Sequence, residues 1–213
     1  MTGSKTSAMF VTLEGGEGAG KSTSRAYIVS LLEEYNVPFI ETREPGGTSI
    51  GEALRELLLS KQGTVPSVTT ELLMVFAARA QHLHEVIEPA LRDGKLVLCD
   101  RFTDATYAYQ GHGRGFDLGE IEALERLVQR GRHPDLTLLF DIHPQLGMAR
   151  ARQRAELDRF EVEELAFFER VREGYLSRAK VDSRFKIIDA SRSIDNVQHA
   201  LREVLLPLID GTS

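Results

Sequence analysis

The sequence contains a single cysteine, no tryptophan and no long apolar segment. The single cysteine, Cys99, excludes an intrachain disulfide and favours a reducing compartment. It lies in the apolar run Leu96-Val-Leu-Cys99, which predicts a buried, unreactive thiol rather than a nucleophile. No apolar stretch approaches the length of a membrane span, and residues 1–8 lack the apolar core of a signal peptide. We therefore expect a cytoplasmic protein.

An excess of positive charge is also missing, since 26 Lys and Arg face 32 Asp and Glu, giving a net charge of -6. We therefore expect no nucleic acid and no membrane as partner, and any polyanionic ligand must be held by local basic clusters. The six histidines are scattered, so we expect each to be structural or exposed, with His112 in a glycine-rich loop. No G-x-S-x-G or H-E-x-x-H motif occurs, which argues against those hydrolases and proteases.

One segment near the start of the chain has the spacing of a phosphate-binding loop. A short apolar strand leads into Gly15-Gly-Glu-Gly-Ala-Gly20-Lys21-Ser22, and a helix-forming segment follows. Glycines let backbone N–H groups surround anionic oxygens, and the helix N-terminus adds its positive dipole. Lys21 is expected to reach the outer phosphates and Ser22 to bind magnesium. The loop therefore predicts binding of ATP or GTP through Gly15, Gly16, Glu17, Gly18, Ala19, Gly20, Lys21, Ser22 and Thr23.

Short apolar runs alternate with amphipathic stretches along the whole chain. Strands are predicted at residues 9–14, 38–42, 96–100, 136–141 and 185–189. Helices are predicted at residues 22–35, 51–59, 69–92, 118–129, 145–154, 163–181 and 194–208. This alternation predicts an α/β fold with a five-stranded parallel sheet covered by helices on both faces. We expect residues 1–8 to be a flexible N-terminus and residues 9–213 to form one domain. Ligands should bind beyond the carboxyl ends of the strands.

Asp100 and Arg101 close one of the apolar strands. A carboxylate at this place is typical of the magnesium side of a phosphate-binding-loop enzyme, and an adjacent guanidinium can hold a phosphate. The alternative is an Asp-Arg pair that caps the next helix. Given the loop, we favour the functional interpretation.

Other cations follow the second predicted strand. Arg43 and Pro45 lie in the turn Thr42-Arg-Glu-Pro-Gly-Gly-Thr48, where proline and paired glycines fix the backbone. Arg55 lies on the helix after this turn, and periodicity alone would make it a solvated helix charge. Arg79 lies in a largely small or apolar helix, where an unpaired guanidinium would be costly, so it is a stronger candidate.

The stretch from residue 148 to 161 places Arg150, Arg152, Arg154 and Arg159 within ten positions. A spacing of two distributes side chains around a helix, so they form no single stripe. They are either a solvated helix surface or a set of charges that folds over ATP.

These motifs together resemble the bacterial thymidylate kinases, phosphate-binding-loop enzymes that phosphorylate dTMP with ATP. The resemblance rests on F-V-T-L-E-G-G-E-G-A-G-K-S-T, T-R-E-P-G-G-T, F-A-A-R-A-Q-H, D-R-F-T-D-A-T-Y-A-Y-Q-G, R-H-P-D-L-T-L-L-F-D and L-D-R-F-E, in the family's order from Phe10 to Ser191. It implies ATP and Mg²⁺ as cofactors, dTMP as acceptor and a homodimer, for which the apolar-rich residues 71–91 could serve.

The resemblance also implies residue roles. Glu17 would contact the sugar 3′-hydroxyl, Arg55 and Arg101 would hold the acceptor phosphate, and Arg43 and Pro45 would also bind the substrate. The base would be recognised by Phe76, which stacks on thymine, Arg79, which hydrogen-bonds a thymine oxygen, and Thr106 and Gln110, with Tyr109 beneath the sugar. Some relatives carry the stacking Phe one residue earlier, where this chain has Val75.

On the ATP side, the resemblance implies a lid at about residues 150–164. Its Arg150, Arg152 and Arg154 would clamp the transferring charge, Arg154 foremost, while Ser191 and Arg192 would border the adenine. Lys21 would bridge the transferring oxygens, and Asp100 would orient the metal shell together with Ser22. Two alternatives remain: a phosphate-binding-loop kinase with another nucleoside or nucleotide acceptor, and a GTP-binding switch. The absence of N-K-x-D and of D-x-x-G after a strand disfavours the switch.

Overall fold

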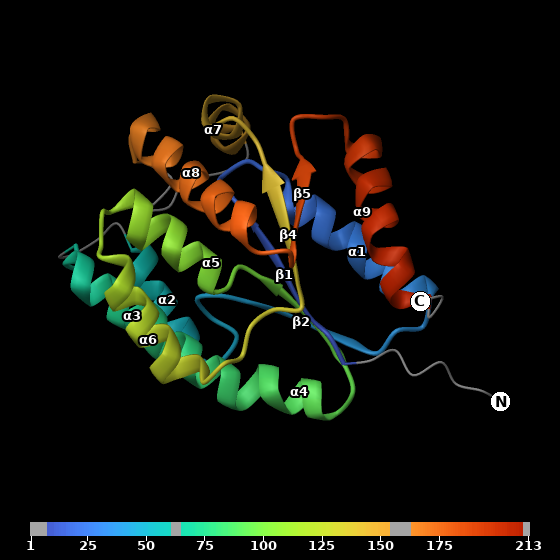
Figure 1. The fold of residues 1–213 in the computed structure, drawn as a ribbon, viewed down its shortest axis with the longest axis horizontal. Helices are drawn as coiled ribbons and strands as arrows, with labels where there is room; N and C mark the ends of the chain where they lie inside the picture. Colours follow the sequence, from blue (N-terminus) through green and yellow to red (C-terminus); the bar gives the residue numbers. More distant parts are fainter. Residues whose placement is uncertain (1–7, 61–64, 154–162, 211–213) are drawn as a thin grey trace.

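The computed structural model describes residues 8–60, 65–153 and 163–210 (Figure 1). Five parallel strands form one sheet in the order β2-β3-β1-β4-β5. Their bounds are β1 (Phe10–Gly15), β2 (Phe39–Arg43), β3 (Leu96–Asp100), β4 (Leu136–Asp141) and β5 (Phe185–Asp189). The predicted α/β fold with a five-stranded parallel sheet is confirmed, and each strand end lies within one residue of its prediction.

Helices cover both faces of the sheet (Figure 1). The helices α1 (Lys21–Glu34) and α9 (Ile194–Ile209) lie on one face. The opposite side carries α2 (Ser49–Leu59), α3 (Val68–His82), the π-helical turn η1 (Leu83–Ile87), α4 (Glu88–Arg92), α5 (Thr103–Thr106), the π-helical segment η2 (Tyr107–Gly113), α6 (Leu118–Gln129) and α8 (Leu165–Val181). The short α7 (Pro144–Arg152) follows β4. Within the described residues, no helix has both the length and the apolar character to cross a bilayer.

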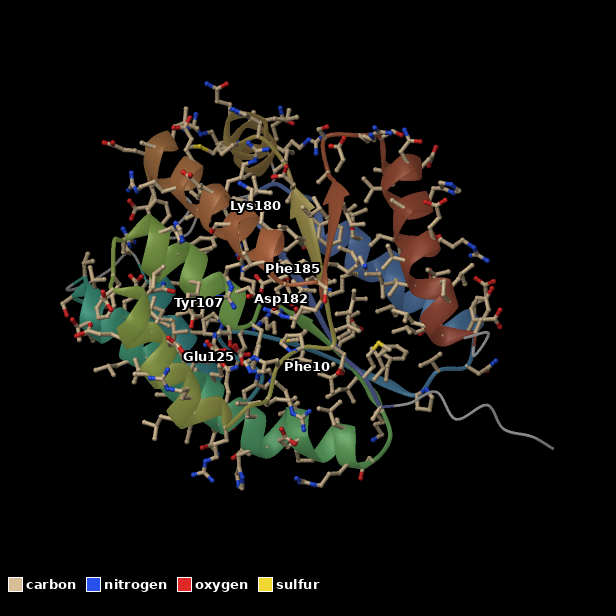
Figure 2. All side chains as sticks on the ribbon, viewed as in Figure 1. Phe10, Tyr107, Glu125, Lys180, Asp182 and Phe185 are labelled. Atoms are coloured by element: carbon tan, nitrogen blue, oxygen red, sulfur yellow. The ribbon has the colours of Figure 1, made fainter. Side chains whose placement is uncertain are left out.

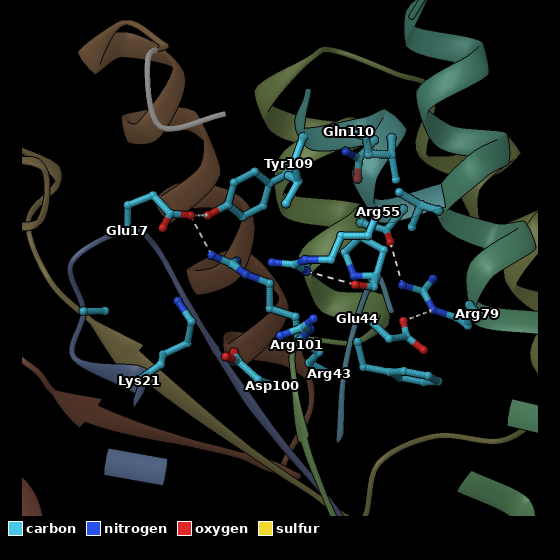
Figure 3. Close-up of a pocket in the computed structure, with 18 of the residues that line it drawn as sticks. Glu17, Lys21, Arg43, Glu44, Arg55, Arg79, Asp100, Arg101, Tyr109 and Gln110 are labelled. Atoms are coloured by element: carbon cyan, nitrogen blue, oxygen red, sulfur yellow. Dashed lines mark hydrogen bonds and ion pairs between the residues drawn. The ribbon is translucent and has the colours of Figure 1, made fainter. Parts of the chain in front are cut away.

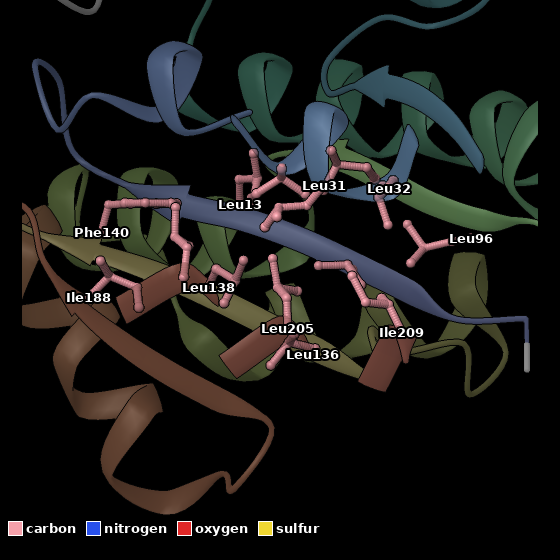
Figure 4. Close-up of a cluster of buried hydrophobic side chains, with 14 of the residues drawn as sticks. Leu13, Leu31, Leu32, Leu96, Leu136, Leu138, Phe140, Ile188, Leu205 and Ile209 are labelled. Atoms are coloured by element: carbon pink, nitrogen blue, oxygen red, sulfur yellow. The ribbon is translucent and has the colours of Figure 1, made fainter. Parts of the chain in front are cut away.

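The central strand β1 divides its side chains between the two layers, because alternate residues of a strand point to opposite faces. Val11 and Leu13 join Leu31 of α1 and Leu205 of α9 in the larger apolar cluster, which Figure 4 shows. Phe10 faces the other side, where it meets Phe102 edge-on at 4.9 Å between ring centroids. All six residues of β1 are buried, so the loop that follows it has a rigid base.

Polar side chains connect the helices of the second layer. Tyr107 Oη donates to Glu125 Oε2 at 2.6 Å, linking η2 to α6 (Figure 2). Asp104, fully buried in α5, accepts from Arg178 Nε of α8 at 2.6 Å and from both terminal nitrogens of Arg184 at 2.7 and 2.8 Å. A buried carboxylate requires such partners, and these bonds fix α5 against α8 and the start of β5.

The structure corrects one sequence expectation. His112 was expected in a glycine-rich loop, but residues 103–113 are helical through α5 and η2. Glycine is a poor helix former, yet here it permits close packing. A Cβ at Gly111 would lie 2.6 Å from Leu118 of α6, and one at Gly113 would lie 2.7 Å from Phe167 of α8. Tertiary contacts therefore outweigh local propensity in this segment.

Two other expectations about buried groups are confirmed. Cys99 is fully buried, and burial raises the pKa of its thiol well above the usual value, which disfavours the nucleophilic thiolate. His82 is buried and structural, with Nδ1 2.9 Å from Glu44 Oε1 and Nε2 2.5 Å from Thr42 Oγ1.

Replacing Asp104 with Asn should destabilise the protein by about 3 kcal/mol, because it removes the fully buried carboxylate that Arg178 and Arg184 both neutralise. Asp182→Asn is the matched control, since Asp182 pairs with the same Arg184 but its side chain is 41% exposed. It should cost less than about 1 kcal/mol. Urea denaturation measures both changes, and equal losses would contradict the role assigned to Asp104.

Candidate active site

A cavity of about 260 Å³ opens at the carboxyl ends of β1, β2 and β3 (Figure 3). In an open parallel sheet this edge is the expected place for a ligand. Most of the predicted site residues come together in its lining: Glu17, Gly18, Ala19, Gly20, Lys21, Ser22, Arg43, Pro45, Arg55, Arg79, Asp100, Arg101, Thr106, Tyr109 and Gln110. Residues separated by more than 90 positions in sequence therefore share one site.

The glycine-rich loop connects β1 directly to α1. Gly20 has φ 77° at the helix start, a left-handed conformation suited to glycine. Lys21 Nζ donates to the carbonyl oxygens of Gly15 and Gly16 at 2.9 and 3.0 Å, so its ammonium lies along the loop. Burial and the charge of Arg101 lower the pKa of Lys21, so this cation favours an added anion. Ser22 and Thr23 are exposed in the first turn of α1.

Gly18 lets this loop pack directly on α7. It has φ 67°, and a Cβ there would lie 1.9 Å from the carbonyl oxygen of Gly147. Likewise, a Cβ at Gly147 would lie 2.3 Å from the carbonyl oxygen of Glu17. The two backbones can approach so closely only because both positions are glycine. The helix that leads into the predicted lid at residues 150–164 thereby packs against the loop.

Arg101 is the central cation of the cavity. Its backbone is left-handed, with φ 70°, which is uncommon for a residue other than glycine. Its Nη2 donates to Glu17 Oε1 at 2.7 Å, its Nη1 to Tyr175 Oη at 3.2 Å, and its guanidinium lies 4.7 Å from the ring centroid of Tyr109. Tyr109 Oη also donates to Glu17 at 2.8 Å (Figure 3). The predicted sugar-side residues Glu17 and Tyr109 and the predicted phosphate-side Arg101 thus form one cluster.

Arg79 is buried and has charged and polar partners, which offset the free-energy cost of burying its guanidinium in a largely apolar helix. Its guanidinium lies between the rings of Phe76 and Phe102, 4.9 Å from each centroid. Its Nε donates to Glu44 Oε2 at 2.7 Å and its Nη2 to Thr106 Oγ1 at 3.0 Å. Its Nη1 is buried without a partner in the described part of the chain. Because Arg79 lines the cavity, one of its donors is left for a ligand.

The other charged residues at the entrance differ in how tightly they are held. The carboxylate oxygen Oδ1 of Asp100 is buried and has no partner among the described residues, although Asp100 lines the cavity. Arg55 Nη1 donates to the carbonyl oxygen of Pro45 at 2.9 Å. Arg43 is half-exposed and pairs with Glu52 at 2.8 Å. No group of three His, Cys, Asp or Glu suited to a metal ion occurs within the ranges that the structure describes.

Comparison with known protein families matches residues 13–201 to the family described as thymidylate kinase. The thymidylate kinase of Pseudomonas putida (strain GB-1) is 54% identical over 202 residues, covering 94% of this chain and 96% of the relative. That of Pseudomonas syringae pv. tomato is 54% identical over 203 residues, 95% of this chain and 97% of the relative. That of Ectopseudomonas mendocina is 52% identical over 204 residues, with the same coverage. The chain belongs to the thymidylate kinase family.

In this member of the thymidylate kinase family, Val75 rather than Phe76 lies in the cavity lining. Phe76 is 2% exposed and packs with Leu72, Tyr107 and Ile121 behind the cavity wall. A shift of one residue rotates a helical side chain by about 100°, which explains why adjacent residues of α3 face different ways. The stacking role expected for Phe76 therefore stays a prediction. In the structure its ring lies beside the guanidinium of Arg79.

The residues predicted for the lid and for the adenine do not line this cavity, and those that the structure describes lie in α7 and in the turn after β5. Arg150 Nη1 donates to the carbonyl oxygen of Ala190 at 2.8 Å, and its Nη2 lies 3.4 Å from that of Ser191. The turn is closed by Asp189, which accepts from Ser191 and from Arg192 Nε. Arg152 is exposed at the end of α7. Arg154, most of the predicted lid at residues 150–164, and nearly all of the N-terminus at residues 1–8 lie outside the described residues.

Sequence reasoning missed the carboxylates that lie behind the cavity-lining residues. Glu44 holds Arg79, Glu71 of α3 accepts from Gln110 Nε2 at 2.8 Å, and Glu14 supports the residues around Arg101. Glu14 was recognised only as the acid that ends the first predicted strand, and Glu44 lies in the turn after the second strand, where Arg43 and Pro45 alone were singled out. Glu71 has no such signal, since an acid in the first turn of a helix is ordinary.

Glu14 is a fully buried carboxyl at the end of β1. It accepts from the backbone N–H of Phe102 at 2.7 Å and from Tyr175 Oη at 2.8 Å. Burial, assisted by the negative charge of Asp104 and opposed by Arg101, raises its pKa to about 8. Glu14 thereby fixes the chain just beyond Arg101 without adding a full negative charge beside the phosphate-binding loop at neutral pH.

Because the folded-state pKa of Glu14 is raised, its protonated form contributes stability that is present in acid and is lost as pH rises through that pKa. The unfolding free energy of the wild type, relative to Glu14→Gln, should therefore decrease between about pH 5 and pH 8. Urea denaturation of both proteins at several pH values gives this difference. A difference that is constant over the range would mean that Glu14 titrates as an ordinary carboxyl.

Proposed function

We propose that the cavity binds dTMP and that the glycine-rich loop binds ATP with magnesium, so that the γ-phosphoryl group passes between them. As a member of the thymidylate kinase family, the protein phosphorylates dTMP to dTDP. The observation that carries the proposal is the cavity itself, which joins the glycine-rich loop to a cluster of arginines around Arg101. Two polyanions can meet only where such positive charge offsets their repulsion.

The base of the acceptor is assigned to the inner end of the cavity. The unpartnered Nη1 of Arg79 supplies a donor for a carbonyl oxygen of thymine, and Thr106 and Gln110 complete the polar contacts. Glu44 and the flanking rings of Phe76 and Phe102 keep the guanidinium fixed, so little ordering is needed on binding. Packing of the cavity-lining Val75 against the base, or stacking of the adjacent Phe76 on it, belongs to the same proposal.

The sugar and phosphate of the acceptor are assigned to the cluster nearer the loop. Glu17 has the acceptor oxygens for a 3′-hydroxyl, and the buried Tyr109 beside it leaves less room for a ribose 2′-hydroxyl. Arg101 and Arg55 offer planar guanidinium groups to the phosphate, with Arg43 and Pro45 at its border.

ATP is assigned to the loop from Gly15 to Thr23, with its adenine near Ser191 and Arg192. The residues fit a magnesium ion held mainly by phosphates: Ser22 is exposed at the helix start, and the buried Asp100 Oδ1 lacks a partner. Magnesium supplies positive charge to the transferring phosphoryl group when it is bound. Ser22 would bind it directly and Asp100 would hold its waters.

The residues of this chain position and neutralise rather than abstract a proton. A phosphate monoester has its second pKa at about 6, so the acceptor oxygen is already ionised near neutral pH and needs no general base. Lys21 moves its ammonium from the loop carbonyls to the transferring oxygens. Arg150, Arg152 and Arg154 of the lid bring further charge to ATP and exclude water, which would otherwise accept the phosphoryl group.

The proposal extends to the organisation of the protein. Residues 9–213 act as one nucleoside monophosphate kinase domain with a lid at about residues 150–164, in the cytoplasm. Two copies associate through helices that flank the sheet, with residues 71–91 in the contact. The exposure of Leu73 on α3 and of Leu57 on α2, at 51% and 60%, supports an apolar contact there.

The test is a coupled assay of ADP release with ATP, magnesium and each nucleoside monophosphate in turn. We expect dTMP to have the highest kcat/KM. Turnover of another monophosphate with none of dTMP would identify a kinase with a different acceptor. Slow hydrolysis of GTP that no acceptor changes would identify a nucleotide-dependent switch, the alternative from another class.

A further inference from the structure

Glu71 is a buried carboxylate that takes no part in the phosphoryl transfer described above. It lies in the first turn of α3 and is 1% exposed. Its Oε1 accepts from Gln110 Nε2 at 2.8 Å and lies 3.6 Å from Arg114 Nε. The guanidinium of Arg114 offsets the negative charge that burial would otherwise make costly. A charged pair is thus maintained directly behind a residue of the cavity wall.

This contact determines which end of the Gln110 amide faces the cavity. A carboxylate can only accept hydrogen bonds, so the NH₂ end of Gln110 must face Glu71. Gln110 lines the cavity, and in the part of the chain that the structure describes its Oε1 receives no hydrogen bond. A ligand that reaches Gln110 therefore meets an acceptor. Arg79, whose Nη1 is unpartnered and whose Nη2 bonds Thr106 four positions before Gln110, presents a donor.

We propose that Glu71 is a positioning residue that sets pyrimidine specificity by holding the Gln110 amide in one orientation. The inference rests on the proposed binding of dTMP in this cavity. Thymine carries a donor at N3–H beside an acceptor at O4, which complements the oxygen of Gln110 and the donor of Arg79. Cytosine carries an acceptor at N3 beside an amino group, which opposes both. If the Gln110 amide could rotate by 180°, it would present its NH₂ group to N3 of cytosine. The Gln110 contact would then no longer discriminate between the two bases, and only the Arg79 contact would.

The test compares kcat/KM for dTMP and dCMP in the full chain by coupled ADP release. A site built to hydrogen-bond its substrate rejects an analogue with mismatched polar groups strongly, so the wild-type ratio should be large. Glu71→Met offers no partner to Gln110 and should lower the dTMP-to-dCMP ratio by at least about tenfold. Glu71→Gln has an amide that can pair with either end of Gln110, and the ratio should fall by a smaller factor.

Glu125→Gln is the matched control, because Glu125 is also a buried carboxylate of the helical layer. It accepts from Tyr107 Oη, and neither residue lines the cavity. Its ratio should equal that of the wild type. A structural defect alone lowers both substrates equally, so wild-type ratios in both Glu71 variants would overturn the proposal. If Glu71→Met does not fold, an unchanged ratio in Glu71→Gln is sufficient to reject it. Failure of the wild type to use dTMP at all would instead reject the proposed function.

Discussion

The arrangement of this site depends on keeping the guanidinium of Arg101 charged in a partly buried position, with 18% of its side chain exposed. Removing such a group from water is costly unless hydrogen-bond partners surround it. Its partners come from three different parts of the fold: Glu17 of the glycine-rich loop, Tyr175 of α8 and the ring of Tyr109 in η2. Satisfying one cation therefore brings the loop, α8 and η2 together at the end of the sheet. The proposed phosphate site and the fold around it share one set of interactions.

Three buried carboxylates behind the cavity wall also hold neighbouring residues in place through hydrogen bonds. Glu44 holds Arg79, Glu71 holds Gln110, and Glu14 holds the chain next to Arg101. None of the three lies at a solvent-exposed surface, and each orients a donor-bearing group of the wall. Groups fixed in this way need little reorganisation when a ligand arrives, which favours both affinity and selectivity. The proposed acceptor site is accordingly built from pairs of interacting side chains rather than from single residues.

Much of this could be predicted from sequence, because periodicity and one specific motif carry it. The alternation of apolar runs placed all five strands, and the glycine-rich loop with the acids at strand ends located the ligand edge. The helical segment at residues 103–113 could not be predicted, since its glycines are explained only by contacts with Leu118 and Phe167, distant along the chain. The supporting roles of Glu44 and Glu71 were equally hidden, because they follow from tertiary neighbours and not from spacing. The presence of Val75 instead of the adjacent Phe76 in the cavity lining likewise follows from how α3 packs and not from its sequence alone.

The most direct test of this account compares dTMP and thymidine binding by calorimetry in the wild type and in Arg101→Met. If Arg101 holds the acceptor phosphate, the variant should lose about ten- to a hundredfold in dTMP affinity, since a charge-assisted hydrogen bond to phosphate is removed. Thymidine has no phosphate, so its affinity should change far less, and the preference for the nucleotide should largely disappear. Equal losses for the two ligands, or no loss for either, would contradict the central place given to Arg101.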